Sequence, residues 1–212
     1  MPVSATLSAA DADSLRACVA DGGVAVFPTD TVYGVCCDPD DHVAAARLYG
    51  LKGRSSMQPS AVMFFSLKAA LDALSELNEA ELGALNALLP GPVTVLLENR
   101  RARFAAACRS DPATFGLRVP WLPEPLHALG AIDAPLMQSS ANISGQADAR
   151  TLDAVPTSLR DGVDVVLDGG VLPGVASTVV DLREYETTGA WHVLREGALA
   201  AEAVGELLAQ AR

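Results

Sequence analysis

The chain has 212 residues, 50% of them hydrophobic and only 5% aromatic, which is enough apolar material for a single domain built mainly on Ala, Val and Leu. The net charge of −11 argues against a broad basic face for nucleic acid, although it still allows a local cationic pocket. No stretch approaches the ~18 apolar residues of a membrane span, and the N-terminus lacks a basic segment followed by an apolar one, so we expect a cytoplasmic protein with no membrane contact.

Helical and extended patterns are mixed along the chain without strict alternation. Helical spacing of apolar residues, stop signals such as Gly and Pro, and short β-branched runs predict the individual elements. Helices are predicted at 11–20, 41–50 (beginning near Asp41 and ending at Gly50), 67–74, 79–89 and 200–211; strands are predicted at 24–27, 61–65, 93–98, 116–119, 135–139, 163–168, 177–182 and 191–195. This mixture favours an α/β fold with an open, twisted, mixed sheet covered by helices, in one domain at 1–212 whose core spans roughly 15–200.

The four cysteines give no strong chemical signal. Cys18, Cys36, Cys37 and Cys108 lack C-x-x-C spacing, so neither a zinc site nor a disulfide framework is predicted. Cys36 and Cys37 point to opposite faces if their segment is extended. We interpret the four cysteines as small buried hydrophobic side chains rather than as catalytic nucleophiles.

Small hydroxyls or a cation follow several predicted strands. These clusters are "PTDT" at 28–31, "LRVP" at 117–120, "QSSANISG" at 138–145, "GVASTV" at 174–179 and "LREG" at 194–197, while Lys52 and Arg54 stand in a further loop that follows the predicted helix 41–50. Because loops at strand ends commonly bind ligands in open α/β sheets, we expect the clusters to share a pocket. Arginine forks, lysine point charges and Ser/Thr hydroxyls suit a triphosphate and an amino acid.

Each cluster also has an ordinary structural reading. Thr29 and Thr31 can make side-chain turns, and the serines near Asn142 can cap a helix. Lys52 and Arg54 can be solvated charges that neutralise nearby aspartates at 38, 40 and 41, and Arg118 and Arg195 can form structural ion pairs. The functional reading instead places Lys52 and Arg54 in a solvent-filled cavity, where truncation to Ala leaves the fold intact. No G-x-x-x-x-G-K-[ST], G-x-G-x-x-G or G-x-S-x-G motif offers another explanation.

The clusters taken together resemble the YrdC-type L-threonylcarbamoyladenylate synthases. The matching motifs appear in family order and cover most of the chain, and the chain resembles the short form. They are "PTDTVYG" (28–34), "KGRSSMQP" (52–59), "PGPVTVLL" (90–97), "LRVP" (117–120), "SSANISG" (139–145), "STVVD" (177–181) and "VLREG" (193–197). The resemblance implies a YrdC-like open sheet with a large concave cationic cavity.

The resemblance also implies an activity. ATP, L-threonine and bicarbonate would give threonylcarbamoyl-AMP and pyrophosphate, and downstream proteins would transfer the threonylcarbamoyl group to tRNA, with at most weak RNA contact by this chain. Thr31, Arg118 and Ser177 would bind threonine. ATP or its phosphates would contact Lys52, Arg54, Gln58, Thr114, Ser140, Asn142 and Arg195, with Lys52 and Arg54 catalytic and Mg²⁺ bound through the phosphates rather than by a protein metal site.

The chain departs from the family pattern at four positions. Ser55 stands where Pro is frequent, Gln58 where Asn commonly precedes the Pro, Met63 where some members have a threonine-contacting His, and Ala176 where Glu is frequent. Two other readings stay open: a module that makes carbamoyl-adenylate from a different substrate, and a YrdC-like paralogue that binds nucleotide or RNA without this chemistry.

Overall fold

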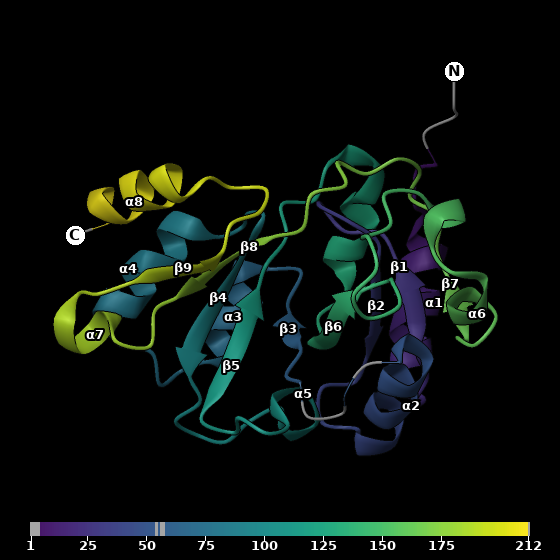
Figure 1. The fold of residues 1–212 in the computed structure, drawn as a ribbon, viewed down its shortest axis with the longest axis horizontal. Helices are drawn as coiled ribbons and strands as arrows, with labels where there is room; N and C mark the ends of the chain where they lie inside the picture. The colour runs from purple at the N-terminus through teal and green to yellow at the C-terminus, as the bar shows by residue number, and fades with distance from the viewer. Residues whose placement is uncertain (1–4, 54, 56–57, 212) are drawn as a thin grey trace.

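The computed structural model describes residues 5–53, 55 and 58–211, and its strands form one mixed sheet (Figure 1). Arg54 therefore lies outside the described residues. In chain order the elements are α1 (Ala9–Ala20), β1 (Ala25–Phe27), β2 (Gly34–Cys37), α2 (His42–Lys52), β3 (Ala61–Met63), α3 (Leu67–Ala73), α4 (Glu79–Leu88), β4 (Val93–Glu98), α5 (Ala105–Cys108), β5 (Thr114–Arg118), η1 (Glu124–Ala131), β6 (Leu136–Ser140), η2 (Leu152–Ala154), α6 (Thr157–Arg160), β7 (Val165–Val166), β8 (Thr178–Asp181), α7 (Tyr185–Thr188), β9 (His192–Arg195) and α8 (Ala201–Gln210).

The strands of the described chain lie in the order β7-β1-β2-β6-β3-β5-β4-β8-β9. The pairs β1–β7, β3–β5 and β4–β8 are parallel, and the other neighbours are antiparallel. Figure 1 shows β4, β5, β8 and β9 grouped on the left and β1, β2, β6 and β7 on the right, with β3 between the groups. The α/β class and the mixed sheet are thus confirmed.

Capping side chains fix where the helices begin. Ser8 accepts a hydrogen bond from the Asp11 amide while the Asp11 carboxylate accepts one from the Ser8 amide, so a capping box starts α1. Asp41 caps α2 by accepting hydrogen bonds from the amides of residues 43 and 44. The predicted end of this helix at Gly50 is wrong: α2 continues to Lys52 and ends at Gly53, whose φ of 57° suits a left-handed C-cap.

Several strands differ from their predicted bounds. Strand β7 contains only Val165–Val166 of the predicted 163–168, because the chain pairs there with the edge of the short β1. The strand Gly34–Cys37 was not predicted, since its sequence shows no alternation; it is buried between β1 and β6. Cys36 and Cys37 are consecutive residues of this strand, and both side chains are buried because both of its faces are covered.

Alternation along β4 separates the core from a polar face. Val93, Val95 and Leu97 are fully buried in the hydrophobic core, whereas Thr94 and Glu98 point to the opposite side of the sheet. Helix α4 packs against α8, which buries Val204 and Leu208. The polar face of β4 and of its neighbour β5 is where the candidate site lies.

Among the described residues, no helix combines the length and the apolar character that a membrane crossing requires.

Candidate functional site

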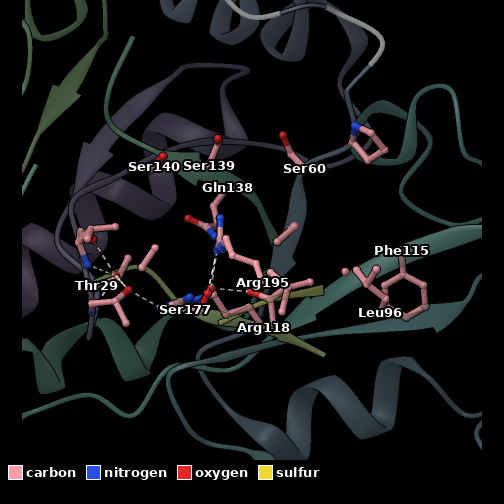
Figure 2. Close-up of a pocket in the computed structure, with 18 of the residues that line it drawn as sticks. Thr29, Ser60, Leu96, Phe115, Arg118, Gln138, Ser139, Ser140, Ser177 and Arg195 are labelled. Atoms are coloured by element: carbon pink, nitrogen blue, oxygen red, sulfur yellow. Dashed lines mark hydrogen bonds between the residues drawn. The ribbon is translucent and has the colours of Figure 1, made fainter. Parts of the chain in front are cut away.

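A cavity of about 300 Å³ lies over the central strands and collects side chains from most of the predicted clusters (Figure 2). Its volume falls at the lower end of the range of about 300–1,000 Å³ that is typical of small-molecule sites. The predicted threonine-binding residues Thr31, Arg118 and Ser177 all line it, and so do the predicted ATP-binding residues Thr114, Ser140 and Arg195. The expectation that separate polar clusters share one pocket is therefore confirmed for these six residues.

The "PTDT" turn positions one wall of the cavity. Thr29 Oγ1 accepts hydrogen bonds from the amides of Thr31 and Val32 and donates to the Val32 carbonyl at 2.7 Å, so it closes the turn on itself. Thr31 Oγ1 lies 3.1 Å from Thr29 Oγ1 and accepts a hydrogen bond of 2.7 Å from Arg118 Nη2. The structural reading of this turn is confirmed, and the same bonds point Thr31 at Arg118 on the cavity wall.

Arg118 forms a buried ion pair with Asp30. Arg118 Nη2 donates to Asp30 Oδ1, and the two side chains are 3% and 5% exposed. The second carboxylate oxygen of Asp30 accepts from the Trp121 amide at 3.2 Å. Burial raises the pKa of Asp30 above its usual value, and the adjacent Arg118 guanidinium opposes that rise.

Arg118 also carries an unused donor. Within the described residues, its buried Nε has no hydrogen-bond partner, although the side chain lines the cavity. Buried donors are rarely left unpaired in native proteins, because desolvating them without a partner costs free energy. The unpaired Nε is consistent with an acceptor that the cavity receives from a ligand, such as a carboxylate.

Strands β4 and β8 supply the opposite wall. Ser177 Oγ lies 2.9 Å from Thr94 Oγ1, and Thr94 is the direct partner of Arg118 across the β4–β5 pair. Arg195 Nη2 donates to the Ser177 carbonyl at 2.8 Å. Gly197 permits this close packing, because a Cβ there would lie 2.2 Å from the Ala176 carbonyl oxygen. Thr94 therefore joins two predicted threonine-binding residues, although sequence reasoning did not single it out.

Lys52 lies elsewhere than expected. Its ammonium donates to the Ser140 carbonyl and to Asn142 Oδ1, the latter at 3.0 Å, and the residue is 2% exposed. Ser140 Oγ also donates to Asn142 Oδ1, at 2.7 Å. The residues that line the cavity include Ser140 but neither Lys52 nor Asn142. The expectation that Lys52 stands in a solvent-filled cavity is wrong, and so is the alternative of a solvated charge: Lys52 is packed behind the cavity wall, where it holds the 140–142 segment.

Of the remaining described positions singled out in the sequence, only Ala176 lines the cavity. The Gln58 side chain is exposed and does not line the cavity, while its carbonyl accepts a hydrogen bond of 2.8 Å from the Tyr49 hydroxyl. Met63 is fully buried and lies outside the cavity lining, whereas Ala176 is part of it. The predicted role of Arg54 falls on a residue whose structure is not described.

Sequence reasoning missed other residues that line the cavity. The polar ones are Ser60, Thr94 and Asp111, while Gln138 begins the predicted "QSSANISG" cluster but was given no binding role. A usable signal existed for Thr94. It is a polar residue between Val93 and Val95 in the otherwise apolar run "VTVLL", and period-2 alternation places it on the face away from the core.

The cysteines are poor nucleophiles in this setting. Cys36, Cys37 and Cys108 are buried, and burial raises the pKa of Cys37 to about 12 and that of Cys108 to about 11. In the part of the chain that the structure describes, no three His, Cys, Asp or Glu side chains group closely enough to hold a metal ion.

Comparison with known proteins places these features in a family. The Sua5/YciO/YrdC family model, described as "Telomere recombination", matches residues 17–197. Proteins named threonylcarbamoyl-AMP synthase are 31% identical to the chain. The one from Vibrio vulnificus aligns over 83% of this chain and 92% of its own length, and the one from Mus musculus over 87% and 67%.

Solved structures agree with the sequence comparison. Sua5 of P. abyssi complexed with L-threonine superposes with a TM-score of 0.82 at 26% identity, covering 95% of this chain. The chain spans 58% of the length of that Sua5 chain. YciO of E. coli superposes with a TM-score of 0.78 at 23% identity over 93% of this chain and 94% of its own, which supports the shared fold. This chain belongs to the Sua5/YciO/YrdC family.

Proposed function

We propose that the chain is a threonylcarbamoyl-AMP synthase that converts ATP, L-threonine and bicarbonate into threonylcarbamoyl-AMP and pyrophosphate. The observation that carries the proposal is the convergence of Thr31, Arg118 and Ser177 with Thr114, Ser140 and Arg195 on one cavity. The synthase names of the relatives favour this function over a carbamoyl-adenylate module or a paralogue that only binds nucleotide or RNA.

The threonine subsite is proposed around Arg118. A guanidinium binds a carboxylate through two parallel hydrogen bonds, and Arg118 has an unpaired Nε on a side chain that lines the cavity. The hydroxyls of Thr31 and Ser177 flank it and can orient the amino acid without adding charge. Asp30 fixes one Nη of the fork, so the guanidinium reaches its ligand in one orientation.

The nucleotide is proposed to span from Ser140 to Thr114, with Arg195 nearby. Arg195 is anchored on the Ser177 carbonyl, and a cation in this position is suited to the charge that develops at the α-phosphate. Lys52 supplies positive charge from behind Ser140 and Asn142 and holds their segment in place. Direct phosphate contact by Arg54 and Mg²⁺ riding on the phosphates are part of the same proposal. Lys52 and Asn142 act from behind the cavity wall, and the exposed Gln58 side chain lies outside the cavity lining.

The reaction needs positioning and electrostatics rather than a covalent nucleophile. The threonine amine attacks the carbon of bicarbonate-derived CO₂ and loses a proton, which gives a carbamate. A carbamate oxygen then attacks the α-phosphorus, a P–O bond to the leaving group breaks, and pyrophosphate departs. Because ATP, bicarbonate and the carbamate are all anionic, cations that are already held in place lower the barrier without reorganising.

The proposal includes a place in metabolism. The mixed anhydride product is an activated acyl donor, so a transferase must consume it, and we propose proteins that modify tRNA in the cytoplasm. The net charge of −11 fits weak RNA contact by this chain itself.

The test is an assay of purified protein with ATP, Mg²⁺, L-threonine and bicarbonate, followed by mass spectrometry of the product and measurement of pyrophosphate. We expect threonine-dependent formation of both products. Serine and glycine, added as competitors, measure selectivity. Absence of any threonine-dependent product would refute the proposed function. The variant Arg118→Lys keeps the charge but loses the fork, and its KM for threonine should rise more than its KM for ATP.

A further inference from the structure

The polar face of the sheet carries the two proposed substrate ends on separate rows of side chains. Residues paired directly across neighbouring strands point to the same face, and so do residues two apart along one strand. Arg118 and Thr94 pair across β5 and β4, at the proposed threonine end. Thr114, four residues back along β5, stands at the proposed nucleotide end. One further row therefore lies between the two ends.

This middle row runs across four strands. Gln138 of β6 pairs with Ala61 of β3, and Ala61 pairs with Gly116 of β5. Gly116 pairs in turn with Leu96 of β4. All four residues line the cavity. Because Ala61, Gly116 and Leu96 have no hydrogen-bonding side chain, Gln138 supplies the polar group of this row.

The Gln138 amide is available to a ligand. The residue is partly exposed and, within the described chain, its side chain makes no hydrogen bond to another residue. Its Oε1 lies over Gly34 of β2, where a Cβ would stand 3.2 Å away, so the glycine leaves room for the amide. Figure 2 shows Gln138 among the side chains that line the cavity. The amide can therefore meet a ligand without first giving up a protein partner.

The bonding of the proposed product places its carbamoyl group over the middle row. In threonylcarbamoyl-AMP, one carbon joins the threonine nitrogen to the oxygen on the α-phosphorus. The threonine carboxylate is proposed at Arg118 and the nucleotide between Ser140 and Thr114. Successive rows on one face are two strand residues apart, about 7 Å. The carbamoyl carbon is linked to both substrates, so it lies between them, over the row that holds Gln138.

A neutral hydrogen-bond donor suits this group chemically. Arg118 and Arg195 already supply cations to the cavity for the carboxylate and the phosphates. A carbamate that takes up a proton loses CO₂, so a group that could hand over a proton would reverse its formation. The glutamine amide has two N–H donors and does not titrate. Donors that are fixed where negative charge develops stabilise that charge without reorganising.

We propose that Gln138 forms the subsite for the one-carbon substrate: its amide N–H groups donate to the oxygens of bicarbonate and then to those of the carbamate. The inference rests on the proposed function and deepens it, because it names a residue that holds the third substrate. Gln138 binds and orients this group and forms no covalent bond with it.

Steady-state kinetics of Gln138→Met test the subsite. Methionine keeps the approximate length and volume of the side chain but removes both N–H donors. In CO₂-depleted buffer with added bicarbonate, we expect the KM for bicarbonate to rise about tenfold or more, as for the loss of a hydrogen bond to a charged group. The KM values for threonine and ATP should stay close to those of wild type, which also verifies that the variant is folded.

Two other variants sharpen the comparison. Gln138→Glu keeps the shape but places a carboxylate beside bicarbonate, so its KM for bicarbonate should rise further than that of Gln138→Met. Gln210→Met is the matched control, because Gln210 is an exposed residue of α8, and its kinetics should equal those of wild type. The inference is overturned if Gln138→Met keeps the wild-type KM for bicarbonate. It is also overturned if all three KM values rise by the same factor, because the side chain would then act only on the fold of the cavity.

A binding measurement separates this inference from the proposed function. The ¹³C NMR signal of [¹³C]bicarbonate is recorded with threonine and α,β-methylene-ATP, which cannot release pyrophosphate. Wild type and Gln210→Met should broaden the signal, and Gln138→Met should not. If wild type broadens it through Gln138 but forms no threonine-dependent product, the subsite stands and the proposed function falls. If product forms while Gln138→Met broadens the signal as wild type does, or if no protein broadens it, the subsite falls.

Discussion

Truncation of Lys52 should weaken the fold as well as any phosphate binding. The side chain is 2% exposed and its ammonium contacts the Ser140 carbonyl and Asn142 Oδ1. Lys52→Ala removes the γ, δ and ε methylenes, which is worth about 2.4 kcal/mol at about 0.8 kcal/mol each. It also leaves the Ser140 carbonyl without this donor, at a cost of about 1–3 kcal/mol, whereas Asn142 Oδ1 keeps its hydrogen bond from Ser140 Oγ.

One effect opposes this loss. The variant no longer has to bury an ammonium. The desolvation free energy that it avoids offsets much of the stabilising free energy of the two lost hydrogen bonds. We therefore expect the free energy of unfolding to fall by about 2–4 kcal/mol, with the methylene packing as its main part. Lys52→Met keeps most of that packing and should recover more than half of the loss.

Urea denaturation followed by circular dichroism measures the difference. Lys68→Ala is the matched control, because Lys68 is an exposed helical lysine whose ion pair with Asp72 is worth little. If Lys52→Ala lies within about 0.5 kcal/mol of wild type, as Lys68→Ala should, then Lys52 is not packed as described. Turnover adds a second readout: Lys52→Met should regain stability without regaining activity.

Three further predictions concern buried or paired groups. Asp30→Ala leaves the buried Arg118 charge without its partner and should cost about 3–5 kcal/mol of unfolding free energy. Asp30→Asn should cost clearly less, because its amide oxygen can still accept the Arg118 hydrogen bond and its side chain fills the same space; chemical denaturation of both variants measures this. Cys108, with a pKa raised to about 11 by burial, should resist a thiol reagent at pH 8 in the native protein and react after unfolding; fast native reaction would contradict the buried setting. The hydrogen bond from Arg47 lowers the pKa of Asp164, so this pair stabilises the fold above the unperturbed value of 3.8 and its contribution is lost as the pH falls through the lowered value. The melting temperatures of wild type and Asp164→Asn should differ at pH 7 and converge only as the pH falls from 3.8 through that lowered value.

The sequence predicted helix and strand positions best where neighbouring residues alone decide them. Asp41 begins α2 as expected, since an N-cap is decided by its own neighbours. Gly50 was a plausible helix end, but a helix tolerates one glycine, and Gly53 offers the left-handed C-cap three residues later. The strand Gly34–Cys37 was not predicted for a different reason. It forms by pairing with β1 on one side and with β6, which is distant in the chain, on the other.

The candidate site was predictable as a set of polar clusters but not as a geometry. "PTDT", "LRVP" and "STVV" each contribute a side chain to the cavity, and their residue types already indicated anionic ligands. No sequence pattern shows that Thr94 stands beside Arg118, because that neighbour relation depends on the β4–β5 register. The burial of Lys52 also escaped prediction, since a lysine after a helix is usually a solvated charge.

Structural and functional readings of one residue need not compete. Arg118 was weighed as either a structural ion pair or a ligand contact, and it is paired with Asp30 while lining the cavity. The pair is too buried to be explained by stability alone, because burying two charges commonly costs as much as their attraction returns. What the pair does achieve is orientation: it holds one edge of the guanidinium and leaves Nε without a protein partner. The buried Asp30–Arg118 pair is therefore better explained by a ligand that accepts a hydrogen bond from Arg118 Nε than by its contribution to folding stability.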